Sequence, residues 1–203
     1  MKNSDEFQSY GAAYWDTGKE DNIGYGEYRY DGRYAKTAKK MAEYYKLKKG
    51  DTVFELACGK GFLLVEFLKL GFQVAGVELS SYAAANAHPD VRPFIVNDDF
   101  YAAKLPMKAF DLVIAKDCLP HMPKNQIPEI VNKCMAISRA HVCFEIEVCR
   151  SPYECDMMYK WDITHITRES PAWWENLLKN SGYQGDYHFK LLVQDDALPN
   201  LDL

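Results

Sequence analysis

The chain has 203 residues, of which 48% are hydrophobic, and its formal net charge is −5. This length and composition suit a single domain with a substantial core. The acidic balance disfavours a nucleic acid partner, because such proteins neutralise phosphates with clustered lysines and arginines. The apolar runs are too short for a membrane span, and the N-terminus lacks the basic start and apolar stretch of a secretion signal. We therefore expect a cytoplasmic protein with no membrane partner.

The cysteines show no C-x-x-C pair, and several lie within apolar runs. A free thiol in such a run packs as a small hydrophobic group. We expect all six to be reduced and structural, with no metal site: Cys58, Cys118, Cys134, Cys143, Cys149 and Cys155.

Residues 1–33, the cover segment, set aromatic side chains among glycines and charged residues with little periodicity. We predict that this segment packs over the remainder of the chain, residues 34–203, which form a single domain. Residues 33–47 have apolar positions at helical spacing and end before Lys49-Gly50, which is a helix stop.

From residue 52 onward, strand-like and helical segments alternate. The expected strands are 52–56, 72–78, 92–96, 110–115 and 140–148, and the expected helices are 60–70, 80–88 and 124–138. Strands that are apolar nearly throughout are typical of a parallel sheet covered by helices on both faces. A helix from about Pro171, a turn and one or two strands follow, so we predict a Rossmann-like α/β fold with seven strands and an antiparallel C-terminal edge.

The loop after the first strand reads ELACGKG, residues 55–61. Gly59 and Gly61 lack a Cβ, so backbone amides can approach a ligand there and the next helix can start close to its strand. The second strand ends on Glu78, whose carboxylate can accept hydrogen bonds from both hydroxyls of a ribose. Ligands of an open parallel sheet bind beyond the carboxyl ends of its strands. The sequence therefore predicts an adenosine-like ligand at this loop.

A dinucleotide is the first alternative, but its fingerprint needs a third glycine near the helix start. Glu55 would also repel a pyrophosphate, whereas it can hold an ammonium group. The loop resembles the first motif of the class I S-adenosylmethionine-dependent methyltransferases, D/E-x-G-x-G-x-G, with Ala57 in place of the first glycine. Later motifs resemble that family in the same order, over roughly residues 34–150: VNDDF at 96–100, FDLVIAKDCLPHM at 110–122 and AISRAHVCFEIE at 136–147.

This resemblance implies S-adenosylmethionine as the cofactor. The residues at the matching positions are Glu55, Ala57, Cys58, Gly59, Gly61, Glu78, Leu79, Asp99, Phe100 and Lys116. Asp99 is preferred to Asp98 as the partner of the adenine amino group, and a polar turn capped by aspartate is the alternative. From the aromatic N-terminal region, Tyr25, Arg29 and Tyr34 are candidates to contact the methionine end of the cofactor.

The flanking stretches YGEYRYDGRY, WDITHIT and GYQGDYHF resemble small bacterial methyltransferases of surface carbohydrate and sugar-nucleotide pathways. That resemblance implies a small polar acceptor, with methylation at an oxygen of a sugar-linked or phosphorylated compound. A hydroxyl acceptor needs a base to remove its proton. His121 is the candidate base, and simple packing in its loop is the alternative. Substrate contacts are expected from His121 and from Asp117, Glu147, Arg150, Trp161 and His165.

Two other functions stay open at this point. An N-methyltransferase would need no base if its amine acceptor arrives uncharged. A non-catalytic protein could keep the fold and the cofactor without turnover.

Overall fold

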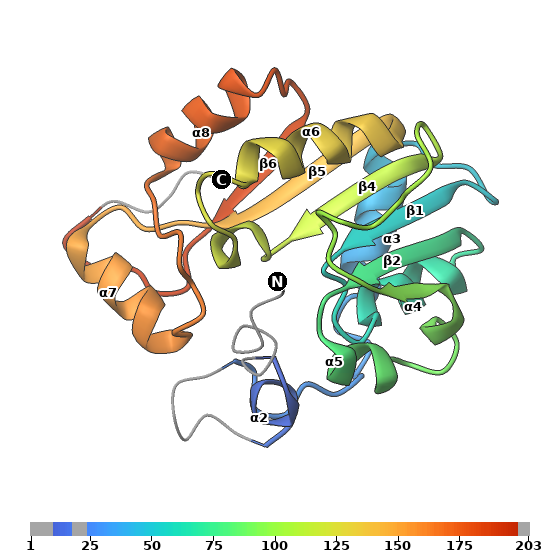
Figure 1. Ribbon diagram of the computed structural model, residues 1–203, viewed down its shortest axis with the longest axis horizontal. Coiled ribbons are helices and arrows are strands. Elements are labelled where there is room, and N and C mark those ends of the chain that lie inside the picture. The colour runs from blue at the N-terminus through green and yellow to red at the C-terminus, as the bar shows by residue number, and fades with distance from the viewer. Residues whose placement is uncertain (1–9, 18–23, 199–203) are drawn as a thin grey trace.

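The computed structural model describes residues 10–17 and 24–198. Its centre is one parallel sheet in the order β3-β2-β1-β4-β5-β6 (Figure 1). The strands are β1 (Thr52–Leu56), β2 (Gln73–Glu78), β3 (Ile95–Asn97), β4 (Phe110–Lys116), β5 (Ser138–Glu147) and β6 (Asp186–Lys190). The strand order reverses between β1 and β4, where open parallel sheets bind their ligands.

Helices connect the strands, and their starts carry recognisable sequence signals. They are α2 (Ala12–Trp15), α3 (Ala35–Tyr44), α4 (Phe62–Lys69), α5 (Ser81–Ala85), α6 (Ile127–Ile137), α7 (Pro152–Trp161) and α8 (Pro171–Asn180), with short 3₁₀ helices η1 (Arg92–Phe94) and η2 (Leu119–His121). Serine side chains cap three of them: Ser80 accepts from the Ala83 amide, Ser151 from Glu154 and Ser170 from Trp173.

Alternate residues of the central strands face two different hydrophobic layers. Val53 and Leu112 pack with residues of α3 and α4 in one cluster. Phe54 and Val113 pack with residues of α6 and α8 in the other. This period of two is what a strand buried on both faces requires. The predicted sheet covered on both faces is therefore confirmed.

The predictions of seven strands and of an antiparallel C-terminal edge are both wrong. The structure shows six strands among the described residues, and β6 runs parallel to β5, with Cys143 opposite Asp186. The physical reason is α8, which carries the chain back along the sheet before β6 begins. The turn at Gly182 follows a helix, as predicted, but leads into one parallel strand and not into an antiparallel pair.

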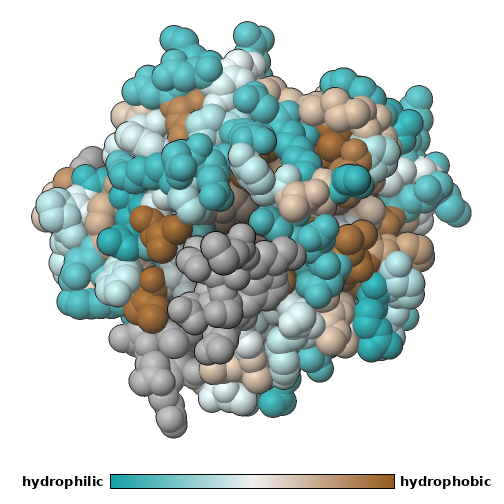
Figure 2. Space-filling model, in the orientation of Figure 1, coloured by the Kyte–Doolittle hydropathy of each residue, from teal (hydrophilic) through white to brown (hydrophobic). Residues whose placement is uncertain are grey.

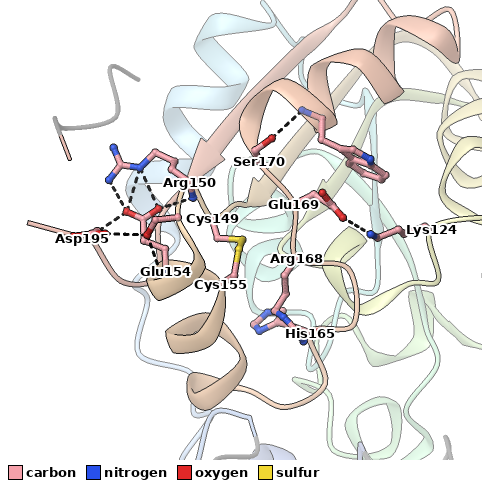
Figure 3. Close-up of a disulfide and its surroundings, with 12 residues drawn as sticks. Lys124, Cys149, Arg150, Glu154, Cys155, His165, Arg168, Glu169, Ser170 and Asp195 are labelled. Carbon is pink, nitrogen blue, oxygen red and sulfur yellow. Dashed lines mark hydrogen bonds and ion pairs between the residues drawn. A yellow bond between two sulfur atoms is a disulfide. The ribbon is translucent and has the colours of Figure 1, made fainter. Parts of the chain in front are cut away.

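The expectation of six reduced cysteines is also wrong. Cys149 and Cys155 form a disulfide, which fastens the chain after β5 to α7 (Figure 3). The other four cysteines are free and buried, as predicted. The two bonded residues stand at a C-x5-C spacing, and α7, which brings them together, was not predicted.

No helix in the described part of the chain is long and apolar enough to cross a membrane. Figure 2 shows hydrophobic residues on one face as separate patches among hydrophilic ones. Isolated apolar residues of this kind are normal on a protein surface.

Reducing the Cys149–Cys155 disulfide should lower the free energy of unfolding by about 2 kcal/mol, because the cross-link restricts the unfolded chain around a short loop. Urea unfolding with and without a thiol reductant measures the change. The Cys149→Ala/Cys155→Ala double variant is the control, and its stability should not respond to the reductant. Equal stability of the parent in both conditions would contradict the proposed role of the cross-link.

Candidate active site

The loop between β1 and α4 is fastened to the end of β2 by one carboxylate. Glu78 Oε2 accepts a hydrogen bond from the Gly59 amide and Oε1 accepts one from the Ser80 amide, both at 2.7 Å. Ala57, Gly59 and Gly61 have φ values of 52°, 55° and 73°, in the region that favours glycine. Glu78 is buried, and burial raises the pKa of its carboxyl group, against the effect of the two amides.

Two further carboxylates lie at the carboxyl edge of the sheet, meaning the edge where the strands end. Glu55 comes from β1 and Asp117 follows β4, the neighbouring strand. Glu55 Oε2 and Asp117 Oδ1 are buried and have no hydrogen-bond partner. Burial raises the pKa of Glu55 to about 8, although Lys116 opposes this change. Buried oxygens without partners are costly, so this edge suits a ligand that brings donors or positive charge.

Lysines neutralise part of this negative charge. Lys116 pairs with Asp117 and with Glu145, whose Oε1 lies 2.6 Å from Nζ. Lys190, from β6, lies 2.9 Å from Asp117 Oδ2 and 3.5 Å from Glu147 Oε1. Burial opposes ionisation of Asp117, but Lys116 and Lys190 hold its pKa below the usual value. Asp117 is thus a fixed negative group with one oxygen still unpartnered.

The described part of the cover segment lies directly on the glycine loop. The Trp15 indole donates to Ser80 Oγ at 3.1 Å, and a Cβ on Gly59 would lie 3.0 Å from the Trp15 ring. Asp16 pairs with Lys60 and accepts from Tyr82 at 2.8 Å. In Figure 1, α2 lies beyond the strand ends, between α7 and α5. A residue larger than glycine at position 59 would disturb this contact.

A second group of polar side chains lies around η2. His121 Nδ1 is 2.9 Å from Thr164 Oγ1, and Thr164 Oγ1 donates to Asp162 Oδ1 at 2.6 Å. Burial lowers the pKa of His121, and the neighbouring His165 lowers it further. His121 is therefore kept in its neutral form, which is able to accept a proton.

His165 stacks on His121, with ring centroids 4.4 Å apart. Its Nε2 lies 2.8 Å from Glu147 Oε2, and both residues are buried. Burial alone would lower the pKa of His165, but the hydrogen bond to Glu147 holds that pKa above the usual value. Ligand atoms of His121, Asp162 and His165 lie within 4.8 Å of one another, a grouping that could hold a metal ion and that we did not predict.

The structure brings most of the predicted substrate residues together. Asp117, His121, Glu147 and His165 are linked by the contacts above. The Trp161 ring stacks on His165 with centroids 6.2 Å apart and meets the Tyr25 ring edge-on at 6.5 Å. Tyr34 lies beside the Tyr28 hydroxyl at 3.4 Å. The Cys58 side chain is buried, and the Leu79 carbonyl accepts a hydrogen bond from Asn97 at 3.2 Å.

Three predicted residues lie elsewhere. Arg29 is exposed and pairs with Glu27. Phe100 is packed in the core with Phe54. Arg150 pairs with Glu154 at 2.6 Å, where the Asp195 amide also donates, at 3.0 Å (Figure 3).

The acidic pair after β3 bonds to its own turn. Asp98 Oδ1 accepts from the Asp99 amide and Asp99 Oδ1 from the Tyr101 amide, both at 2.9 Å. Both carboxylates keep further acceptor sites, so the preference for Asp99 as the adenine partner stays a prediction.

Sequence reasoning missed Asp162, Thr164, Lys190 and Tyr14. Asp162 and Thr164 stand beside His165 in WDITH, a polar cluster whose spacing was a usable signal. Lys190 reaches Asp117 only through the pairing of β6 with β5. Tyr14 is buried, and burial followed by the nearby Asp162 carboxylate raises its pKa well above the usual value.

Comparison with known proteins agrees with this arrangement. The family described as "Methyltransferase domain" matches residues 53–140. The ubiquinone biosynthesis O-methyltransferase of Rhodopseudomonas palustris (strain BisB5) is 29% identical over 96 residues, which are 44% of this chain and 36% of that protein. The match thus covers just over a third of the relative's length.

Solved methyltransferase structures share the fold. A SAM-dependent methyltransferase from Archaeoglobus fulgidus superposes with a TM-score of 0.60 at 20% identity, over 76% of this chain and 71% of its own. Phosphoethanolamine N-methyltransferase 2 of Haemonchus contortus, in complex with S-adenosyl-L-methionine, superposes with a TM-score of 0.65 at 18% identity, over 87% of this chain and 43% of its own. The family match indicates a methyltransferase domain in residues 53–140, from β1 to the start of β5, and the solved S-adenosylmethionine-dependent methyltransferase structures share its fold.

Proposed function

We propose that the protein transfers the methyl group of S-adenosylmethionine to a hydroxyl oxygen of a small polar metabolite, one that is sugar-linked or phosphorylated. The observation that carries the proposal is the set of carboxylates at the carboxyl edge: Glu55 and Glu78, which are buried, and Asp117, of which one oxygen is buried. Together they fit the ribose and the ammonium group of the donor.

The donor side fits S-adenosylmethionine. Glu78 uses one lone pair of each oxygen for the Gly59 and Ser80 amides, which leaves acceptor sites for the two ribose hydroxyls. The unpartnered oxygens of Glu55 and Asp117 suit the ammonium group at the methionine end. The bound cofactor supplies an activated methyl on a sulfonium, so the protein mainly has to align the reacting atoms.

The acceptor side supports an oxygen nucleophile. A hydroxyl must lose its proton during transfer, and His121 is neutral and partly buried beside Thr164. Glu147 and Lys190 offer an acceptor and a cation to a polar, hydroxyl-bearing or phosphorylated compound. The names of the relatives agree in part: one is an O-methyltransferase, and the other acts on a phosphorylated amine. The sugar-linked class rests on the resemblance of the flanking stretches.

A screen with methyl-labelled cofactor tests this proposal directly. Sugar nucleotides, phosphorylated metabolites and matched amines are offered to the protein, and the labelled product is identified by mass spectrometry. Label on an oxygen supports the proposal. Label on nitrogen favours the N-methyltransferase, and cofactor binding without any product favours a non-catalytic protein.

Replacing Glu78 should weaken cofactor binding. Glu78→Ala removes the acceptor for the ribose hydroxyls, so affinity should fall about five- to 150-fold, which corresponds to about 1 to 3 kcal/mol. The amides of Gly59 and Ser80 also lose their acceptor, so the ligand-free protein should lose stability as well. Calorimetric titration and urea unfolding measure the two effects.

Glu66→Ala is the matched control, because Glu66 is a buried glutamate of α4 that bonds Tyr30 and lies 3.4 Å from Lys69. It should lose stability while keeping cofactor affinity. Equal affinity of Glu78→Ala and the parent would mean that the ribose lies elsewhere.

Cofactor binding should depend on pH through Glu55. Its pKa of about 8 means that the free protein holds a proton there at neutral pH, and an ammonium ligand needs the carboxylate. Binding must then release that proton, so affinity should rise with pH, by up to about tenfold per unit between pH 6 and 7.5. Above about pH 8 the amino group of the ligand loses its own proton, which reverses the trend.

Calorimetry in two buffers with different ionisation enthalpies should show this proton release in the parent protein. Glu55→Gln carries no titratable group and should give a nearly flat profile below pH 7.5. An equally steep rise in that variant would show that another group titrates.

His121→Asn should lower the rate of methyl transfer by about 10²-fold or more while cofactor affinity stays within a few-fold. The parent's rate should fall with decreasing pH only below about 6.5, because burial lowers the pKa of His121 from that value. Single-turnover kinetics with the identified acceptor measure both effects. If the variant keeps its rate but has a lower melting temperature, His121 is a packing residue. If neither the rate nor its pH profile changes, the acceptor is a neutral amine.

A further inference from the structure

Three side chains form a hydrogen-bonded chain that ends on His121. The Asp162 carboxylate oxygen Oδ1 accepts from the Thr164 amide at 2.9 Å and from the Thr164 hydroxyl at 2.6 Å. The same hydroxyl oxygen lies 2.9 Å from His121 Nδ1. Asp162 is almost fully buried, so water does not compete for this carboxylate.

Counting protons assigns the direction of every bond in this chain. A carboxylate only accepts hydrogen bonds, and a hydroxyl has a single proton to donate. The Thr164 proton therefore goes to Asp162, and its oxygen must accept from His121. In a neutral imidazole one nitrogen carries the proton, and here that nitrogen is Nδ1.

We infer that Thr164 and Asp162 are positioning residues that fix the tautomer of His121, with Nδ1 protonated and Nε2 free to take the proton of a hydroxyl acceptor. This inference deepens the proposed function and rests on it. Nδ1 is the ring nitrogen whose side-chain partner the structure fixes, at Thr164 Oγ1. Neither Thr164 nor Asp162 needs to touch the substrate.

The hydrogen-bonded chain of Asp162, Thr164 and His121 also stabilises the product of proton transfer. When Nε2 takes the proton, the oxygen's electron pair forms the bond to the methyl carbon, and the carbon–sulfur pair stays on sulfur as a thioether. The resulting imidazolium keeps its Nδ1 hydrogen bond, and the negative charge of Asp162 lies one hydroxyl away. Proton, methyl and electrons are then all accounted for.

Other titratable groups surround His121 and shape its pH response. From the loop after α7 and from β5 these are Asp162, His165 and Glu147, and from the cover segment Tyr10 lies edge-on at 6.2 Å while Tyr14 lies by Asp162 and Thr164. His165, held by Glu147, disfavours a second positive charge on the stacked His121 ring. Asp162 and Glu147 act in the opposite direction. The pH profile of each variant therefore has to be compared with that of the parent.

The tautomer can be observed without any acceptor or cofactor. Protein labelled with ¹⁵N-histidine gives a long-range ¹H–¹⁵N spectrum in which protonated and unprotonated ring nitrogens differ, and His121→Asn identifies the His121 signals among five histidines. At pH 7.5 the parent should show His121 with Nδ1 protonated and Nε2 unprotonated. The opposite tautomer in the parent would overturn the inference, whether or not any variant folds.

Variants of Thr164 test the consequence for catalysis. Thr164→Val keeps the shape but removes the hydroxyl, so His121 should lose its single tautomer and methyl transfer should slow about threefold to tenfold, with cofactor affinity unchanged. Thr164→Ser restores the hydroxyl and should restore both the spectrum and the rate. A Thr164→Val protein with the parent's spectrum and rate would contradict the role of Thr164.

The same samples decide between this hydrogen-bonded chain and a metal site. A metal ion shared by His121, Asp162 and His165 would bind the lone pair of one His121 nitrogen, and so would displace either the Nδ1 proton or the free Nε2 lone pair. One equivalent of zinc retained through dialysis, and lost in His165→Gln, would overturn the inference. Metal-free parent protein with the Nδ1-protonated tautomer supports it, and if such protein also fails to bind cofactor, the proposed function falls while the tautomer assignment stands.

Discussion

The burial of carboxylates without enough partners is the constraint on which the rest of the site depends. Parallel strands end at one edge, and β1, β2 and β4 bring Glu55, Glu78 and Asp117 together there. Each buried oxygen without a partner costs stability. Backbone amides satisfy Glu78, and lysines partly satisfy Asp117, but Glu55 Oε2 and Asp117 Oδ1 keep no partner. A ligand that carries hydroxyls and an ammonium group would remove this cost, so cofactor binding and stability are linked.

The acceptor side depends on α7, and several interactions hold that helix. The disulfide joins Cys149, just after β5, to Cys155 in the helix. Glu154 accepts hydrogen bonds from Arg150 and from the Asp195 amide (Figure 3). The loop that follows α7 carries Asp162, Thr164 and His165. Arg150, a predicted substrate residue, thus affects the acceptor side by holding α7 in position through its contacts with Glu154.

Sequence reasoning succeeded where local pattern decides the structure. The strand 52–56, the glycine loop and the carboxylate ending the second strand could be predicted because apolar runs, missing Cβ atoms and a fixed spacing are local signals. Sequence reasoning failed where the structure depends on contacts between residues far apart in the sequence. The direction of β6 follows from the crossover through α8, and Lys190 meets Asp117 only because β6 adds to β5. The spacing within WDITH pointed to a polar cluster, but its contact with His121, like the disulfide, depends on how α7 folds back onto the sheet.

The central claim is that the carboxyl edge binds the methyl donor with Glu78 on its ribose. A crystal structure of the protein with S-adenosylhomocysteine tests it most directly. The account predicts the ribose hydroxyls within hydrogen-bond distance of Glu78 and the ammonium group beside the oxygens of Glu55 and Asp117 that lack partners. A ligand bound away from these three carboxylates, or crystals grown at millimolar ligand that hold none, would contradict it.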